Sequence, residues 1–136
     1  MRSIITIISL LFTTGTQKAP VVNILGKVNH IEIHFFKGKH PGIYKTSMAI
    51  DLQYLKGLIN KAHNNPGIKT DTTGEIIYFS KNCQIFKVYF ATKGSGSQLS
   101  SAIVMFNDGT KNVKSLMNYG SGMLIDEEYY QTSKNK

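Results

Sequence analysis

The stretch Gln84-Ile-Phe-Lys-Val-Tyr-Phe-Ala-Thr92 decides the fold, because its side chains alternate along a run of strand-forming residues. Successive side chains of a β-strand point to opposite faces, so Phe86, Val88 and Phe90 share one face. The other face carries Ile85, Lys87, Tyr89 and Ala91. We therefore expect a strand with one face in the core and the other at least half exposed to water.

Two runs on either side extend this strand into an antiparallel meander. Glu75–Phe79 is rich in β-branched and aromatic residues and ends at a polar break before Cys83. Ala102–Phe106 is apolar at every position, which is typical of a strand covered on both faces, and we expect it to be the central strand. The segment Asn107–Thr110 has hairpin turn chemistry, with Gly109 where φ must be positive.

The first half of the chain predicts one more strand and one helix. Alternation between Val28 and Phe36 predicts a strand with an apolar face and a polar face. A helix is predicted from about Leu52 to His63, with Asp51 as its N-cap. Its core-facing stripe consists of Leu52, Leu55, Leu58, Ile59 and Ala62. Ile43–Ile50 could be a second short strand or the approach to the helix.

The remaining C-terminal segments are less regular. Val113–Tyr119 could form a strand or a short helix, and Met123–Ile125 is expected to be a last edge strand. The predicted fold class is α+β: an antiparallel sheet of about four to six strands with one main amphipathic helix packed on one face, in the order β-α-β-β-β. This order is similar to that of cystatin-like and NTF2-like folds, in topology alone.

The first 16 residues have the pattern of a secretory signal peptide, which leaves residues 17–136 as a single domain. Arg2 forms a short charged start, Ile4–Phe12 is apolar, and Thr13–Thr16 offers small residues for cleavage. We therefore expect a secreted or periplasmic protein without a transmembrane segment in the mature chain. If residues 1–16 form a β-strand instead, the protein is expected to be cytoplasmic.

The charge of the chain is basic, with 16 Lys and Arg against 8 Asp and Glu. Arg2 is the only arginine, so the chain has poor means of gripping phosphates or bases in a bidentate manner. Cys83 is the only cysteine, which excludes an intrachain disulfide and fits no zinc motif. The glycine-rich segment Lys93–Ser97 lacks the order of a phosphate-binding loop, and the sequence indicates no cofactor.

Three polar residues on one strand face are the candidate metal ligands. His30, Glu32 and His34 alternate, so their side chains point the same way. His30 and His34 are about 13 Å apart along a strand, which means that an ion would bind Glu32 with one histidine and a ligand from elsewhere. The alternative is a solvated polar face with a cross-strand ion pair.

The candidate binding residues are Tyr89, Lys87, Tyr78, Lys37 and Lys39. The leading hypothesis is an exported, non-catalytic binding module that holds a protein or polymer partner on a sheet face through aromatic side chains and lysines. One alternative is a basic module that binds nucleic acid or another polyanion electrostatically. The other is a small metal protein or enzyme that uses His30, Glu32 and His34, although no converging nucleophile and base are apparent.

Overall fold

The computed structural model of the chain describes residues 21–36, 42–92 and 101–125. These residues form one antiparallel six-stranded sheet in the order β2-β1-β3-β4-β5-β6. Its strands are β1 (His30–Phe35), β2 (Gly42–Thr46), β3 (Gly74–Ser80), β4 (Cys83–Ala91), β5 (Ala102–Asn107) and β6 (Asn112–Met117). The helices are α1 (Val21–Leu25) and α2 (Ala49–Asn60), so the predicted α+β class with one main helix is confirmed.

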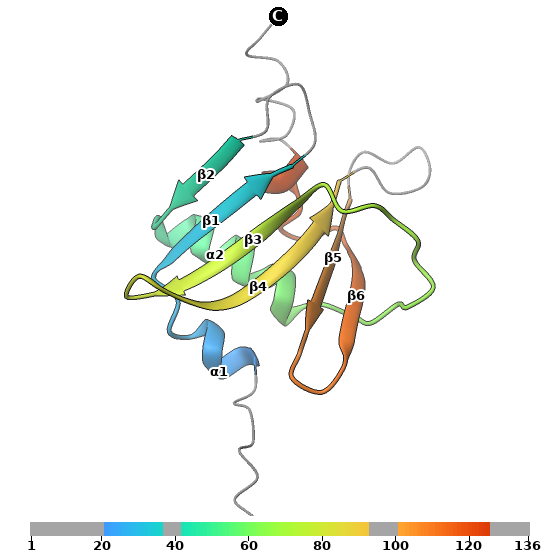
Figure 1. Cartoon of the computed structure of the whole chain (residues 1–136), viewed down its shortest axis with the longest axis horizontal. Coiled ribbons are helices and arrows are strands. Elements are labelled where there is room, and N and C mark those ends of the chain that lie inside the picture. Colours follow the sequence, from blue (N-terminus) through green and yellow to red (C-terminus); the bar gives the residue numbers. More distant parts are fainter. Residues whose placement is uncertain (1–20, 37–41, 93–100, 126–136) are drawn as a thin grey trace, which may run out of the picture.

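The helix α2 lies across one face of the sheet. Figure 1 views the sheet from its other face, so that α2 lies behind the strands. Leu55, Leu58 and Ile59 of α2 are buried against the apolar side chains of the strands. Leu25 of α1 is buried in the same core, so the short first helix closes one end of it. None of the described helices is both long and apolar enough to cross a membrane.

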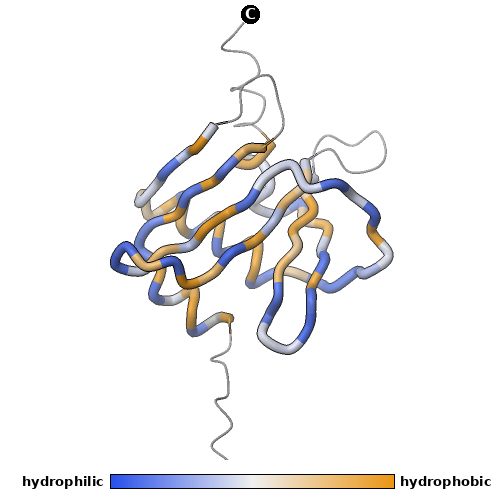
Figure 2. Tube along the Cα trace, viewed as in Figure 1, coloured by the Kyte–Doolittle hydropathy of each residue, from blue (hydrophilic) through white to orange (hydrophobic). Residues whose placement is uncertain are grey.

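The alternation predicted for β1 and β4 is confirmed, except that Ala91, expected on the half-exposed face of β4, is fully buried. Ile31, Ile33 and Phe35 are buried, while the intervening residues of β1 are only partly buried. Val88 and Phe90 are fully buried on the same side of the sheet. Figure 2 shows the resulting change between hydrophilic and hydrophobic residues along the strands. We call the side covered by α2 the inner face, and the opposite side, which carries no described helix, the open face.

The boundaries of α2 differ from the prediction, and Asp51 is not its N-cap. The helix begins at Ala49, after β2, and Met48 occupies the N-cap position without a side-chain cap. Asp51 lies in the first helical turn, where its carboxylate accepts hydrogen bonds from Tyr44 (3.0 Å) and Thr46 (2.5 Å) of β2. An acidic residue in the first turn also complements the positive end of the helix dipole. The segment left open in the sequence therefore contains both a strand and the start of the helix.

The prediction that Ala102–Phe106 is the central strand was wrong. β3 and β4 are the central strands, and β5 lies one strand from the edge, next to β6. The residues are nevertheless buried on both sides, since Ile103 on the open face is 4% exposed and Val104 on the inner face 0%. Burial on both faces therefore did not require a central position.

The hairpin between β5 and β6 has the predicted turn chemistry, and residues 112–117 form a strand rather than a helix. Gly109 has a φ of 96°, a conformation that favours glycine. The carboxylate of Asp108 accepts hydrogen bonds from the side chain and amide of Thr110 and from the amide of Lys111. These bonds, first that from the Thr110 side chain, lower the pKa of Asp108 to about 2.

Residues 122–125 form one helical turn and not the expected edge strand. The carbonyl of Ser121 accepts from the amides of Leu124 and Ile125, and Leu124 is buried in the core. Gly120 reverses the chain just before this turn with a φ of 69°. Further expectations concern residues 1–16, Lys37, Lys39 and Lys93–Ser97, and these lie outside the described residues.

Candidate binding face

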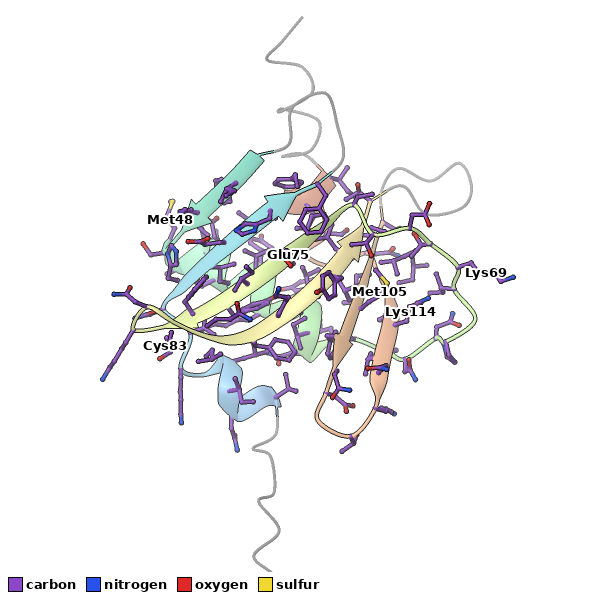
Figure 3. The ribbon with its side chains drawn as sticks, in the orientation of Figure 1. Met48, Lys69, Glu75, Cys83, Met105 and Lys114 are labelled. Carbon is purple, nitrogen blue, oxygen red and sulfur yellow. The ribbon has the colours of Figure 1, made fainter. Side chains whose placement is uncertain are left out.

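The open face contains a row of side chains that crosses all six strands. The strand registers place its members opposite one another, and we call them the transverse row. It consists of Ile43 (β2), His34 (β1), Glu75 (β3), Tyr89 (β4), Met105 (β5) and Lys114 (β6). Figure 3 shows Glu75, Met105 and Lys114 on the near side of the sheet, away from α2. The topology therefore collects residues from distant parts of the chain on one surface.

Glu32 is the centre of a set of ion pairs at one end of this face. Its carboxylate lies 2.8 Å from Nζ of Lys45 on β2. Nε2 of His30 and Nε2 of His34 lie 3.3 Å and 3.1 Å from its two oxygens. These hydrogen bonds, first that from Lys45, lower the pKa of Glu32 from 4.5 to about 2. Glu32 therefore stays ionised well into the acid range.

His34 connects Glu32 with Glu75 on the neighbouring strand. Its Nδ1 lies 3.2 Å from a carboxylate oxygen of Glu75, while its Nε2 faces Glu32. Through these two contacts His34 joins β1 to β3 on the open face.

Glu75 continues the network to β4. Its second oxygen lies 3.0 Å from Nζ of Lys87, and this hydrogen bond is the main reason why the pKa of Lys87 is raised. The Lys87 ammonium also lies 5.7 Å from the ring centroid of Tyr89. Tyr89 itself is 43% exposed, so an aromatic ring stands open to solvent beside this ion pair.

A hollow of about 470 Å³ lies next to Tyr89. The connector between α2 and β3 forms its wall. Figure 1 shows this connector passing the β6 edge of the sheet. The lining residues are Asn64, Pro66, Lys87, Tyr89, Met105, Phe106, Asn107, Asn112, Val113 and Lys114. The lining of the hollow thus combines two aromatic residues, other apolar residues, three asparagines and two lysines.

Three hydrogen bonds fix Lys114 and the connector to each other. The amide of Asn65 donates to the carbonyl of Lys114 (2.6 Å), and the amide of Lys114 donates to Oδ1 of Asn64 (3.0 Å). Nζ of Lys114 donates to the carbonyl of Ile68 (2.8 Å). The wall of the hollow is therefore held against the edge strand rather than left loose over it.

The structure places the candidate metal ligands and two of the candidate binding residues on the same face, and it places Tyr78 on the other face. His30, Glu32 and His34 lie on the same face as Lys87 and Tyr89, with Glu75 between them. Tyr78 lies on the inner face instead: it is fully buried and donates a hydrogen bond of 2.8 Å to the carbonyl of Leu55.

Burial raises the pKa of Tyr78 far above its usual range, so this phenol stays neutral. It is therefore a core residue, which cannot contact a partner on the open face. Among the five predicted binding residues, Lys87 and Tyr89 are the two that the structure places on the open face.

Sequence reasoning missed Glu75, Met105 and Lys114 as members of the same surface. Each lies in a recognisable strand, but its opposite neighbours depend on strand order and register. Alternation alone could have placed Glu75 on the same face as Ile77, because the two residues are two positions apart. Nothing in the sequence could have shown that His34 would lie opposite Glu75.

The carboxylates on this face are paired with lysines, Glu32 with Lys45 and Glu75 with Lys87. Across the parts of the chain that the structure describes, no group of three or more His, Cys, Asp and Glu side chains is arranged to hold a metal ion. His30 and His34 contact different oxygens of Glu32, so the carboxylate lies between the two rings. The metal site at these three residues stays a prediction.

Comparisons with protein-family models, with curated proteins and with solved structures find no match to this chain.

Proposed function

We propose that the protein is a small, exported, non-catalytic binding module that holds a protein partner on its open face. The observation that carries this proposal is the exposed ring of Tyr89, which lies between an ion-paired network and a hollow lined by the connector. Tyrosine is enriched at the energetic centres of protein interfaces, where its ring is buried and its hydroxyl finds a partner.

The network supports binding because it positions the surface before a partner arrives. Lys87 is held by Glu75, Glu75 by His34, and the connector by Lys114. Side chains already held in one geometry lose less conformational entropy on association. A partner that covers Tyr89 therefore meets a pre-formed surface.

The charge balance of this face favours a protein partner over a polyanion. Lys45 and Lys87 are each paired with a carboxylate, Glu32 and Glu75 respectively. A phosphate backbone would have to approach these carboxylates in order to reach the lysines. Among the residues that the structure describes, this face therefore carries no continuous stripe of unpaired cations of the kind that a nucleic acid requires.

The protonation states of the network also support a non-catalytic role. A general acid or base works best with a pKa near the operating pH. The pKa of Glu32 is about 2, and the pKa of Lys87 is raised, so both groups remain charged near neutrality. Export is the part of the proposal that rests on the signal pattern of residues 1–16.

The test compares two equally exposed tyrosines. Tyr89 is 43% exposed on the open face, and Tyr119 is 40% exposed on the other side, near α2. The mature chain, Tyr89→Ala and Tyr119→Ala are each immobilised and exposed to extract of the source organism, and retained proteins are identified by mass spectrometry. We expect one protein to be retained by the mature chain and by Tyr119→Ala, and to be lost with Tyr89→Ala. Equal retention by both variants would overturn the proposal.

A further inference from the structure

We propose that the hollow beside Tyr89 receives a short acidic segment of the partner protein. A carboxylate of this segment would contact Lys114, and a neighbouring apolar side chain would cover Tyr89 and Met105. This inference rests on the function proposed above and adds the chemical class of the bound segment.

The charges that line the hollow select a negative group. Two lysines line it, Lys87 and Lys114, and no lining residue carries a carboxylate. Asn64, Asn107 and Asn112 are also in the lining, so side-chain amides are present beside the ammonium groups. Lys87 already pairs with Glu75 outside the lining, so Lys114 supplies the positive charge that is complementary to a carboxylate.

Lys114 is the lysine best placed for this contact. Its Nζ donates one hydrogen bond of 2.8 Å to the carbonyl of Ile68. An ammonium group has three donors, so further donors remain for a ligand while the first bond keeps the charge at the wall of the hollow. Figure 3 shows Lys114 close to Met105, in front of β5 and β6.

The same surface limits the length of the negative segment. Glu75 lies directly opposite Tyr89 on β3 and is bonded to Lys87, and Glu32 lies beyond it. A uniformly charged polymer that continued across the sheet would meet these carboxylates and be repelled. The hollow is therefore suited to one or two acidic residues rather than to a long polyanion.

The apolar half of the contact comes from Tyr89 and Met105, which lie opposite each other in neighbouring strands. Tyr89 offers an exposed ring, and Met105 is partly exposed with a side chain that adapts to different shapes. Tyr89 and Lys114 are two strands apart, or roughly 10 Å at the usual strand spacing. About three extended residues span this distance, so the acidic and apolar side chains of the ligand should be two or three positions apart.

The experiment uses fluorescein-labelled peptides and the mature protein. The probe is acetyl-Phe-Ser-Glu-Glu-Ser-Lys(fluorescein)-amide, and its matched peptides replace both Glu with Gln or replace Phe with Ala. Fluorescence anisotropy at 50 mM salt should show affinity for the probe about tenfold above that for either matched peptide, since each change removes one half of the contact. This comparison needs no protein variant and is unaffected by folding defects.

Two protein variants locate the contact. Lys114→Gln should weaken probe binding about fivefold or more, because the fixed ammonium is lost. Lys69→Gln is the matched control: this exposed lysine lies on the same connector, is absent from the lining and points away from the sheet in Figure 3. Its affinity for the probe should equal that of the unchanged protein.

Equal affinity for the acidic and amide peptides would overturn the inference, as would equal effects of Lys114→Gln and Lys69→Gln. A single-stranded DNA 12-mer that binds more tightly than the probe, and loses this binding with Lys114→Gln, would assign the hollow to a polyanion instead. If the peptides are not distinguished but Tyr89→Ala still loses the captured protein, the inference fails while the proposed function stands. If Tyr89→Ala retains that protein as Tyr119→Ala does, the proposed function fails as well.

Discussion

The inner and open faces of the sheet differ in what holds their side chains. Phe90 and Tyr89 are consecutive in β4, yet Phe90 is 0% exposed on the inner face and Tyr89 is 43% exposed on the open face. Inner-face side chains pack against one another and against α2, whereas those around Tyr89 are held by ion pairs between strands. The buried side chains of the inner face therefore supply most of the stability, and the open face is the one on which we propose that a partner binds.

The largest expected difference between the faces is in the free energy of unfolding. Phe90→Ala removes a buried ring that packs edge-on against the ring of Phe35, with 5.6 Å between the ring centroids. We expect this change to lower the free energy of unfolding by about 3–5 kcal/mol. Tyr89→Ala removes a ring that is already half in water, and we expect a loss of about 1 kcal/mol or less. Urea unfolding followed by circular dichroism measures both values.

Equal losses in the two variants would remove the distinction between the faces. A loss of more than about 3 kcal/mol for Tyr89→Ala would indicate that its ring is part of the core. Such a result would also make any binding defect of this variant a consequence of unfolding.

The ion pairs of the open face should contribute less to the free energy of unfolding than the buried ring of Phe90 does. Their contribution should also depend on pH. Glu32 has a folded-state pKa of about 2, below its ordinary 4.5, so its stabilising contribution is present above pH 4.5 and is lost as pH falls toward 2. We expect Glu32→Gln to cost roughly 1–2 kcal/mol at pH 7, a figure reduced for solvent screening because Lys45 is largely exposed.

The measurement is urea unfolding of both proteins between pH 2 and pH 7. The difference in the free energy of unfolding between the unchanged protein and Glu32→Gln should shrink toward zero as the pH falls to 2. Lys45→Gln should reproduce most of the effect, because the hydrogen bond from Lys45 is the main cause of the low pKa. A difference between the unchanged protein and Glu32→Gln that does not vary with pH would contradict this account of the network.

Periodicity predicted the inner face, but the open face required the register. Alternation alone assigned these core residues to one face, because successive side chains of a strand point to opposite sides of the sheet: Ile31, Ile33, Val88 and Phe90. Strand order cannot be read in this way, so β5 was expected at the centre and Tyr78 on a binding surface.

The candidate site was predicted in two separate halves. His30, Glu32 and His34 formed one half, which was predicted as a metal site. Lys87 with Tyr89 formed the other, which was predicted as part of a rival binding surface. The two halves were separate because each lies within one strand. Glu75 of β3 joins the halves, and only the pairing of β3 with both β1 and β4 reveals this. The α2 boundary was missed for a similar reason, since Asp51 bonds to β2 rather than capping the helix.

The methyl groups of methionine offer the most direct test of the claim that the open face is the binding face. Met105 lies in the transverse row, Met117 is 3% exposed on the inner face, and Met48 is 63% exposed at the start of α2. The protein is labelled at its methionine methyl carbons, signals are assigned with single Met→Leu variants, and spectra are recorded as the captured partner is added.

We predict that the Met105 signal shifts or broadens first, while those of Met117 and Met48 stay in place. A shift of Met48 with an unchanged Met105 signal would place the partner on the helical side and contradict the account.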